Sequence, residues 1–473
     1  MPKNKRILAL LLTIILCLSG CVSRPPRFDQ QSSPSASPTQ EISVLPSPSP
    51  TQEVSISPSP SPSPEASSSP TPSSQEEADS SDEVLDMLTS DDFEGRLTGS
   101  EGNKKAGAYL AEQFRLIGLQ PFDEDYYHEY TQRVLDFSQH KSEITLHMTD
   151  GSRIQLENGA DYLQFFDGSP IAAEGAITFD LDDESISEKI FVTDKASDIS
   201  LAGMKKAKAI LYKNADFSRM STIAEDIGQI KTPLIKIIPE VYQRLEAGEA
   251  DKVSISIVSH GMEATVSNVV GVIPGRNRKK AVILSAHYDH VGRAGELIYR
   301  GAVDNASGVT VLLDIAQSLM NTPSADFEMD IIICAFNGEE AMLKGSDAFV
   351  DHILESYESV YNINFDCLGA NQGGDLVITG NKELSHTLYL ELEKVLVEDG
   401  FICKWSHMGG ISDYVSFLNE NISSVNLSNE ELKQIHTPMD APDQVDVAYL
   451  ERLSESIVRF LILFNDDIFG EEM

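Results

Sequence analysis

Five acidic and imidazole side chains stand in short motifs whose residue types suit metal chemistry. They are His287 in SAHYDHVG, Asp304 in GAVDNASG, Glu340 in FNGEEA, Asp366 in NINFDCLG and His436 in QIHTPMD. Neutral imidazoles and carboxylates are the nitrogen and oxygen ligands that zinc takes in catalytic sites. A pair of zinc ions needs, in addition, one carboxylate that contacts both ions. The five residues therefore have the types and the number that a two-metal hydrolytic site requires.

The elements around these motifs predict how they are positioned. Four of the five follow an apolar run typical of a strand, and His436 lies in a loop before the last predicted helix. Beyond Asn268 the chain alternates strands and helices. Strands are predicted at NVVGVIP, AVILSA, MDIIICAF, YNINFD, DLVITG and 422–427, and helices at 305–320, 346–356, 383–398 and 446–464. This alternation predicts an α/β fold with a mainly parallel sheet covered on both faces and reactive residues at the strands' carboxyl ends.

The residues before Asn268 do not show this alternation of strands and helices. Order is predicted to begin near Glu83, and apolar residues at helical spacing predict a helix over 101–117 that ends at Gly118. Residues 140–260 then alternate short β-rich runs with turns and contain none of the five candidate ligands. Most of this stretch is predicted to be an inserted β-rich subdomain.

Composition limits the partners of the protein. The 473 residues are 41% hydrophobic, enough for one large domain or two. The 36 Lys and Arg against 74 Asp and Glu give a formal net charge of -38. Such a charge repels nucleic acid and anionic lipid, so we expect no nucleic-acid partner.

The first twenty residues have the pattern of a secretory signal. Basic residues precede the apolar run Ile7 to Leu16, and Leu18-Ser19-Gly20-Cys21 resembles a bacterial lipobox. The resemblance implies cleavage of residues 1–20, a lipid on Cys21, and a location on the bacterial cell surface where the lipid anchor is the only contact with the membrane. An ordinary signal peptide or a short membrane anchor is the alternative, although a spanning helix needs ~20 apolar residues.

Residues 21–82 are predicted to form a disordered tether rich in Ser and Pro. The stretch contains a near repeat, SASPTQEIS and SPSPTQEVS, and cannot bury a core. After Cys17 in the signal and Cys21, only Cys334, Cys367 and Cys403 remain. Three cysteines exclude a disulfide scaffold, although one bridge remains possible. The metal ligands are expected to be nitrogen and oxygen atoms.

The motifs together resemble a known family. EGR-x-x-GS, H-x-D, DN-x-SG, the EE pair, N-x-D and H-T-P-x-D occur here in the order found in co-catalytic zinc aminopeptidases related to bacterial leucyl aminopeptidase and yeast aminopeptidase Y. The resemblance implies that residues 83–473 form a metallopeptidase domain with a three-layer α/β/α zinc-exopeptidase-like fold. The insert at 160–258 looks like the protease-associated domain that several members carry.

The resemblance also implies roles for individual residues. Asp304 would bridge two Zn²⁺ ions, with His287 and Asp366 completing one site and Glu340 and His436 the other. A water between the metals would become acidic enough to supply hydroxide near neutral pH.

Three further features of the site follow from the same resemblance. Glu339 would be the general base, and Asp289 would fix the tautomer of the neighbouring imidazole. The substrate pocket would include Ser412, Asp413 and Tyr414, where the family commonly has S-D-H, and Val303 replaces the usual first aspartate before Asp304. His290 is either a structural histidine or a further neighbour of the metals.

The function these expectations imply is a surface-tethered zinc aminopeptidase acting on peptides. Three alternatives stay open from the sequence. A single-zinc glutaminyl cyclase has a similar fold, but the presence of both His287 and Asp366 argues against it. A non-catalytic peptide-binding relative would be expected to lack some ligands. A serine hydrolase would need a G-x-S-x-G motif, which the chain lacks.

Overall fold

The computed structural model describes residues 77–165, 168, 170–220, 232–322, 327–407 and 409–464. The predicted signal peptide, Cys21 and the tether up to residue 76 lie outside the described residues. Among the helices of the described part, each is too short or too polar to cross a bilayer.

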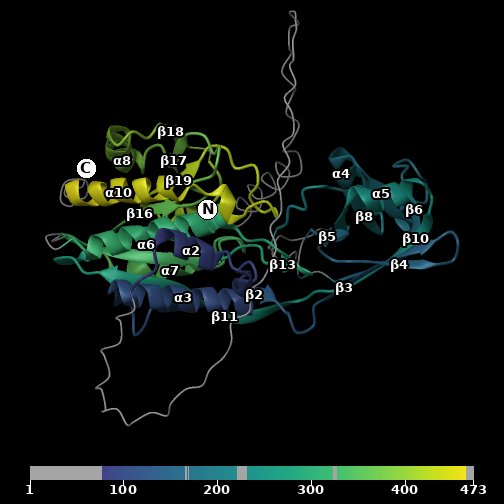
Figure 1. Ribbon diagram of the computed structural model, residues 1–473, viewed down its shortest axis with the longest axis horizontal. Helices are drawn as coiled ribbons and strands as arrows, with labels where there is room; N and C mark the ends of the chain where they lie inside the picture. Colours follow the sequence, from purple (N-terminus) through teal and green to yellow (C-terminus); the bar gives the residue numbers. More distant parts are fainter. Residues whose placement is uncertain are drawn as a thin grey trace, which may run out of the picture. The chain divides into compact units, whose positions relative to one another are not determined.

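A nine-stranded sheet lies at the centre of the part of the described chain that contains the five candidate ligands. Its strands follow the order β1-β11-β15-β12-β16-β19-β17-β18, and β2 also pairs with β11 (Figure 1). They span β1 Gln120–Pro121, β2 Tyr127–Leu135, β11 Gly261–Ile273, β12 Asn277–His287, β15 Met329–Phe336, β16 Ser359–Phe365, β17 Leu376–Gly380, β18 Cys403–Ser406 and β19 Ser423–Asn429. The four central strands β15, β12, β16 and β19 run parallel, whereas antiparallel pairs flank them.

Helices cover both faces of this sheet. They span α2 Ser81–Leu88, α3 Glu101–Ile117, α6 Ser307–Met320, α7 Lys344–Ser356, α8 His386–Glu398, α9 Tyr414–Asn419 and α10 Val447–Leu463. Side chains of α2, α3, α6, α8 and α10 share one apolar cluster with one face of the sheet, and those of α7 and α9 share another with the opposite face. The expected three-layer α/β/α architecture with a parallel centre is confirmed.

The strand pattern explains why the centre of the sheet is parallel and buried. Every residue of β15 is buried, and successive residues alternate between the two helix layers. Ile331 and Ile333 pack in one cluster, and Ile332 and Cys334 in the other. A strand that is apolar on both sides is stable only where helices cover both faces.

Polar residues determine where the helices begin and end. The hydroxyl of Ser100 caps α3 by accepting a hydrogen bond from the Asn103 amide at 3.1 Å, and Gly118 ends it at φ 91°. The predicted range 101–117 is confirmed. Helix α8 begins at 386, three residues later than predicted, because Asn381 Oδ1 holds the amides of residues 383 and 384 in a turn.

A second, eight-stranded sheet occupies the β-rich stretch. Its order is β4-β3-β10-β6-β7-β8-β9-β5, with strands at β3 Lys141–Met148, β4 Arg153–Leu156, β5 Tyr162–Gln164, β6 Ile171–Thr178, β7 Ile190–Thr193, β8 Ala209–Lys213, β9 Leu234–Ile237 and β10 Ala250–Val258. Helices α4 Ala196–Met204 and α5 Pro239–Glu246 pack on it. Strands β3 and β4 precede residue 160, so the second sheet begins before the predicted start of the insert. That this insert is a protease-associated-like domain stays a prediction.

Candidate metal centre

Three neighbouring parallel strands bring most of the candidate ligands together. His287 is the last residue of β12, Glu340 follows β15, and Asp366 follows β16 directly. Because β12 pairs in parallel with both β15 and β16, the carboxyl ends of the three strands meet at one edge of the sheet. His436 lies in the loop between β19 and α10, as predicted.

Asp304 is positioned differently from the sequence expectation. It lies in the helical turn Ala302–Ala306 that leads into α6, rather than at the end of a strand of the central sheet. Asp440 holds this turn, because its two carboxylate oxygens accept hydrogen bonds from the amides of Val303 at 2.7 Å and Asp304 at 3.1 Å. Burial raises the pKa of Asp440 to about 6. Asp440 is the aspartate of the H-T-P-x-D motif, and the motif alone does not reveal this role.

The Asp304 carboxylate faces two imidazoles with different oxygens. Its Oδ1 lies 3.4 Å from Nε2 of His287, and its Oδ2 lies 2.9 Å from Nε2 of His436. Nε2 of His287 is also 3.4 Å from Asp366 Oδ1, and Nε2 of His436 is 3.0 Å from Glu340 Oε1. One carboxylate is thus shared by two separate groups of potential ligands.

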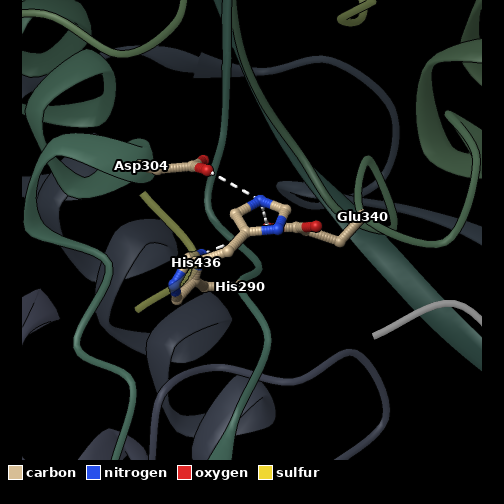
Figure 2. A group of neighbouring side chains, drawn as sticks. All are labelled: His290, Asp304, Glu340 and His436. Carbon is tan, nitrogen blue, oxygen red and sulfur yellow. Dashed lines mark ion pairs between the residues drawn. The ribbon is translucent and has the colours of Figure 1, made fainter. Parts of the chain in front are cut away.

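Within the described residues these two groups have the composition of metal sites. The first consists of His287, Asp304 and Asp366. The second consists of His290, Asp304, Glu340 and His436, which converge from four separate segments of the chain (Figure 2). His290 therefore joins the second group, where its fully buried Nδ1 lies 3.2 Å from Glu340 Oε1. Its position next to the H-x-D motif was the only sequence signal for this.

The donor atoms of both groups suit a divalent cation. Asp366 Oδ1 and both ring nitrogens of His290 are buried and form no hydrogen bond with any described residue. Buried polar atoms are costly unless a partner satisfies them, and imidazole with carboxylate is a donor set that zinc accepts. The residues present therefore fit two zinc ions.

In both groups, buried imidazoles and carboxylates lie close together and change each other's pKa. Burial lowers the pKa of His287, but the surrounding carboxylates, first that of Glu339, outweigh it and raise this pKa well above its ordinary value. The pKa of His436 is raised in the same way by Glu340 and Asp304. Burial raises the pKa of Asp304, yet hydrogen bonds from the two imidazoles bring it well below its usual range. The cluster as a whole attracts positive charge.

Asp289 lies behind His287, but its backbone carbonyl, rather than the predicted carboxylate, is within hydrogen-bond distance of the imidazole. The closest atom to His287 Nδ1 is the backbone carbonyl oxygen of Asp289 at 3.2 Å, and the carboxylate Oδ1 is 3.7 Å away. The carboxylate itself accepts hydrogen bonds from the Thr98 hydroxyl at 2.9 Å and the Glu339 amide at 3.2 Å. A protonated Nδ1 leaves Nε2 free to bind a metal.

Glu339 lies beside these ligands, and its backbone amide donates a hydrogen bond to the Asp289 carboxylate. Burial raises the pKa of its carboxyl well above the ordinary value. His287 opposes this effect, while Glu340, Asp413 and Asp366 add to it. A carboxylate with a raised pKa next to a metal group is suited to proton transfer.

The three predicted pocket residues are all buried. Asn364 Nδ2 donates to the Ser412 hydroxyl at 2.9 Å, and the Tyr414 hydroxyl donates to the Gly410 carbonyl at 3.1 Å. Asp413 is fully buried, and burial raises its pKa to about 7. A separate cavity of about 160 Å³ lies beside the ligands, lined by Val303, Ala370, Asn371, Gln372, Glu431, Leu432, Lys433, Gln434, Ile435, Asp440 and Gln444.

Arg96 of the EGR motif holds the backbone next to two of the predicted ligands. Its side chain is completely buried and donates to the carbonyl of Tyr288 at 2.7 Å and that of Gly301 at 2.8 Å. Tyr288 follows His287, and Gly301 begins the turn that contains Asp304. One guanidinium thus connects the two segments that carry these ligands, a role that the motif alone did not reveal.

Comparison with known proteins relates this site to a family. Residues 268–461 match the model of peptidase family M28. Aminopeptidase YwaD of Bacillus subtilis is 26% identical over 276 residues, which are 56% of this chain and 58% of that relative. A probable glutamate carboxypeptidase of Zea mays, VP8, is 31% identical over 197 residues, which are 37% of this chain and 26% of that protein. The chain thus spans less than two thirds of these curated relatives.

Solved structures show the same fold. The zinc aminopeptidase BSAP from Bacillus subtilis superposes with a TM-score of 0.62 at 21% identity, over 83% of this chain and 95% of that chain. A peptidase M28 precursor from Shewanella amazonensis gives a TM-score of 0.61 at 18% identity, over 83% and 93%. The match by sequence covers β12 and the later strands of the nine-stranded sheet, the metal groups and the H-T-P-x-D loop. The residues that match the model of peptidase family M28, 268–461, contain all five predicted ligands.

Proposed function

We propose that the protein is a two-zinc exopeptidase that removes N-terminal residues from peptides. The observation that carries this proposal is the geometry of Asp304, whose two carboxylate oxygens face His287 and His436 separately. Such a shared carboxylate is what a pair of metal ions requires. The family match and the names of the relatives support a peptidase activity, and one relative and one solved structure are named as aminopeptidases.

The residues around the metal groups would have different roles in the reaction. Bound zinc would polarise the scissile carbonyl and make the attacking water more acidic. Glu339 would accept a proton from the attacking water and deliver it to the departing amine, a role that its raised pKa favours. Asp289 keeps His287 in the tautomer that presents Nε2, and Asp440 holds the backbone of Asp304 in place.

A glutaminyl-cyclase-like enzyme with one zinc and a non-catalytic peptide-binding module are the other candidates. The first needs only one group of ligands, whereas two groups sharing Asp304 are present among the described residues. The second needs no general base, whereas Glu339 lies beside the ligands with a raised pKa. Both observations favour the two-zinc exopeptidase.

We also propose that the enzyme is held at the bacterial cell surface through a lipid on Cys21. The lipobox-like sequence and the Ser/Pro-rich stretch that follows it support this location. Peptides are its proposed substrates. The net charge of -38 makes nucleic acid an unfavourable partner.

Metal analysis combined with a substrate panel tests the proposed function. Purified protein should contain about two zinc ions per chain, and a strong chelator should abolish hydrolysis of aminoacyl-nitroanilides until zinc is restored. N-acetylated versions of the same substrates serve as the control and should resist cleavage. A single zinc in fully active protein would support the cyclase-like candidate. Release of C-terminal residues from N-blocked peptides would instead show a carboxypeptidase.

A further inference from the structure

A segment of the inserted subdomain reaches the metal centre. Residues 214–220 follow strand β8 of the second sheet, and Arg219 in this segment contacts His436 through its backbone. The Arg219 amide donates a hydrogen bond to the His436 carbonyl at 2.9 Å. In the other direction, His436 Nδ1 lies 3.1 Å from the Arg219 carbonyl oxygen. His436 is therefore held at two points by the insert.

The contact between His436 Nδ1 and the Arg219 carbonyl determines which ring nitrogen of His436 can bind a metal. A carbonyl oxygen only accepts hydrogen bonds, so the contact requires the proton of the imidazole to be on Nδ1. In the neutral imidazole, the form that binds a metal, Nε2 then keeps its lone pair, and Nε2 is the atom that faces Asp304 and Glu340 at 2.9 and 3.0 Å. A partner of this kind on the remote ring nitrogen fixes both the tautomer and the orientation of a metal-binding histidine.

Side-chain anchors hold the segment that carries Arg219. The hydroxyl of the fully buried Tyr299 donates to the Phe217 carbonyl at 2.7 Å. The ammonium of Lys236, which is 3% exposed, donates to the Ser218 hydroxyl at 2.6 Å and also to the Ser218 carbonyl. The Arg219 guanidinium itself donates to the carbonyl of Arg293. Residues 214–220 are thus anchored by Lys236 of the second sheet and by Tyr299 and Arg293, which follow β12 of the nine-stranded sheet.

The two metal groups differ in their dependence on this segment. His287 is oriented by Asp289, two residues away in the same strand end. His436 lies in a loop at φ 60°, outside any helix or strand, and its Nδ1 partner comes from a residue 217 positions earlier. A change in the insert therefore alters the orientation of His436 and leaves that of His287 as it is.

We propose that Arg219 is a positioning residue for His436 and that the insert thereby controls how firmly one of the two metal ions is held. The ion concerned is the one that the second group, His290, Asp304, Glu340 and His436, would hold. This inference rests on the proposed two-zinc function. It gives the insert a role at the metal centre itself, separate from any role in admitting substrates.

Zinc release from the intact, zinc-loaded chain tests the proposal. Arg219→Ala removes the guanidinium anchor, and Tyr299→Phe removes the hydroxyl anchor while keeping the buried ring. Each variant is mixed with excess chromophoric chelator, and the rate of release is followed for each zinc equivalent. We expect one equivalent to leave about 10–100-fold faster than in the unchanged protein, the range found for partners behind metal ligands, and the other at its original rate. Arg244→Ala, on the exposed face of α5, is the matched control and should change neither rate.

The possible outcomes separate this proposal from the proposed function. Unchanged release from both Arg219→Ala and Tyr299→Phe overturns it. Equal acceleration of both equivalents, together with a lower melting temperature, also overturns it, because the segment would then be a general support of the fold. A single zinc in the unchanged protein refutes the two-zinc function. The positioning role is then judged by whether that single ion leaves Arg219→Ala faster.

Discussion

At the residue scale, two adjacent glutamates have different surroundings. Glu340 directs Oε1 to His436 Nε2 at 3.0 Å and to His290 Nδ1 at 3.2 Å. Glu339 has its backbone amide bound to Asp289, and its raised pKa comes first from burial. The neighbouring positions are therefore suited to different tasks, one to binding a metal and the other to moving a proton.

Replacing the proposed base should separate catalysis from metal binding. Glu339→Gln keeps the size of the side chain but removes its ability to accept a proton. We expect the zinc content and the melting temperature to stay unchanged while kcat falls about 10²–10⁴-fold. Glu391→Gln, on the exposed side of α8 and weakly paired with Lys394 at 3.8 Å, is the control. Activity within tenfold of the unchanged enzyme would show that another group is the base.

His290 should contribute to the second metal group. Its ring is fully buried, and neither ring nitrogen forms a hydrogen bond with a described residue. We expect His290→Ala to weaken the binding of one zinc at least tenfold, on the order of the loss seen for groups that support metal ligands. Competition with a chelator of known affinity measures this, and the exposed His386→Ala is the control. If both zinc affinities are unchanged, His290 is a structural histidine.

At the scale of elements, the contact between α2 and α6 contains a partly buried acid, Asp314. Asp314 of α6 accepts hydrogen bonds from the Ser81 hydroxyl at 2.9 Å, and burial raises its pKa to about 6 from 3.8. A carboxyl whose pKa is raised on folding binds its proton more tightly in the folded state. Its contribution therefore favours folding in acid and is lost as the pH rises from 3.8 through about 6.

Removing this charge should stabilise the contact at neutral pH. Asp314→Asn keeps an oxygen that accepts from Ser81 but cannot ionise. We expect the variant to be more stable than the unchanged protein at pH 8, by at most about 2–3 kcal/mol, with the difference shrinking as the pH falls to 5. Denaturant unfolding at several pH values measures this. Asp251→Asn, an exposed position in β10, should show no such trend. A pH-independent difference between Asp314→Asn and the unchanged protein would show that folding does not raise the pKa of Asp314.

At the scale of the whole molecule, the catalytic part and the N-terminal stretch have separate tasks. The described residues contain all the candidate ligands, whereas residues 1–76 contain the lipobox-like sequence and most of the Ser/Pro repeat. A flexible linker contributes reach but no chemical group to a distant site. The location of the protein and its activity should therefore respond to different changes.

Two N-terminal variants test this separation. Cys21→Ala should release the protein from the membrane fraction or leave its precursor unprocessed, because the acyl chains on one cysteine supply the anchoring at ~0.8 kcal/mol per buried CH₂. Deleting residues 30–75 should keep the protein anchored and active on small peptides. Fractionation and a nitroanilide assay report the two properties. A Cys21→Ala protein that stays membrane-bound with normal processing would contradict lipidation.

Local pattern was enough to predict most of the catalytic fold. The largely apolar runs that end at His287, Phe336 and Phe365 became adjacent parallel strands, because strands buried on both faces need helices on both sides of the sheet. The helix over 101–117 was predictable from its own cap and its glycine end. The ligands could be named because each is part of a motif only a few residues long.

Only the tertiary structure showed which distant groups support those ligands. Arg219 is 217 positions from His436, and Asp440 is 136 positions from Asp304. Arg219 acts through its backbone, which every residue type has, so no sequence pattern distinguishes it. The sequence determined the ligand types and the strands that carry them, because these depend on side-chain chemistry and short-range periodicity. The orientation of each imidazole was decided by packing, because it depends on which carbonyl the folded chain places beside the second ring nitrogen.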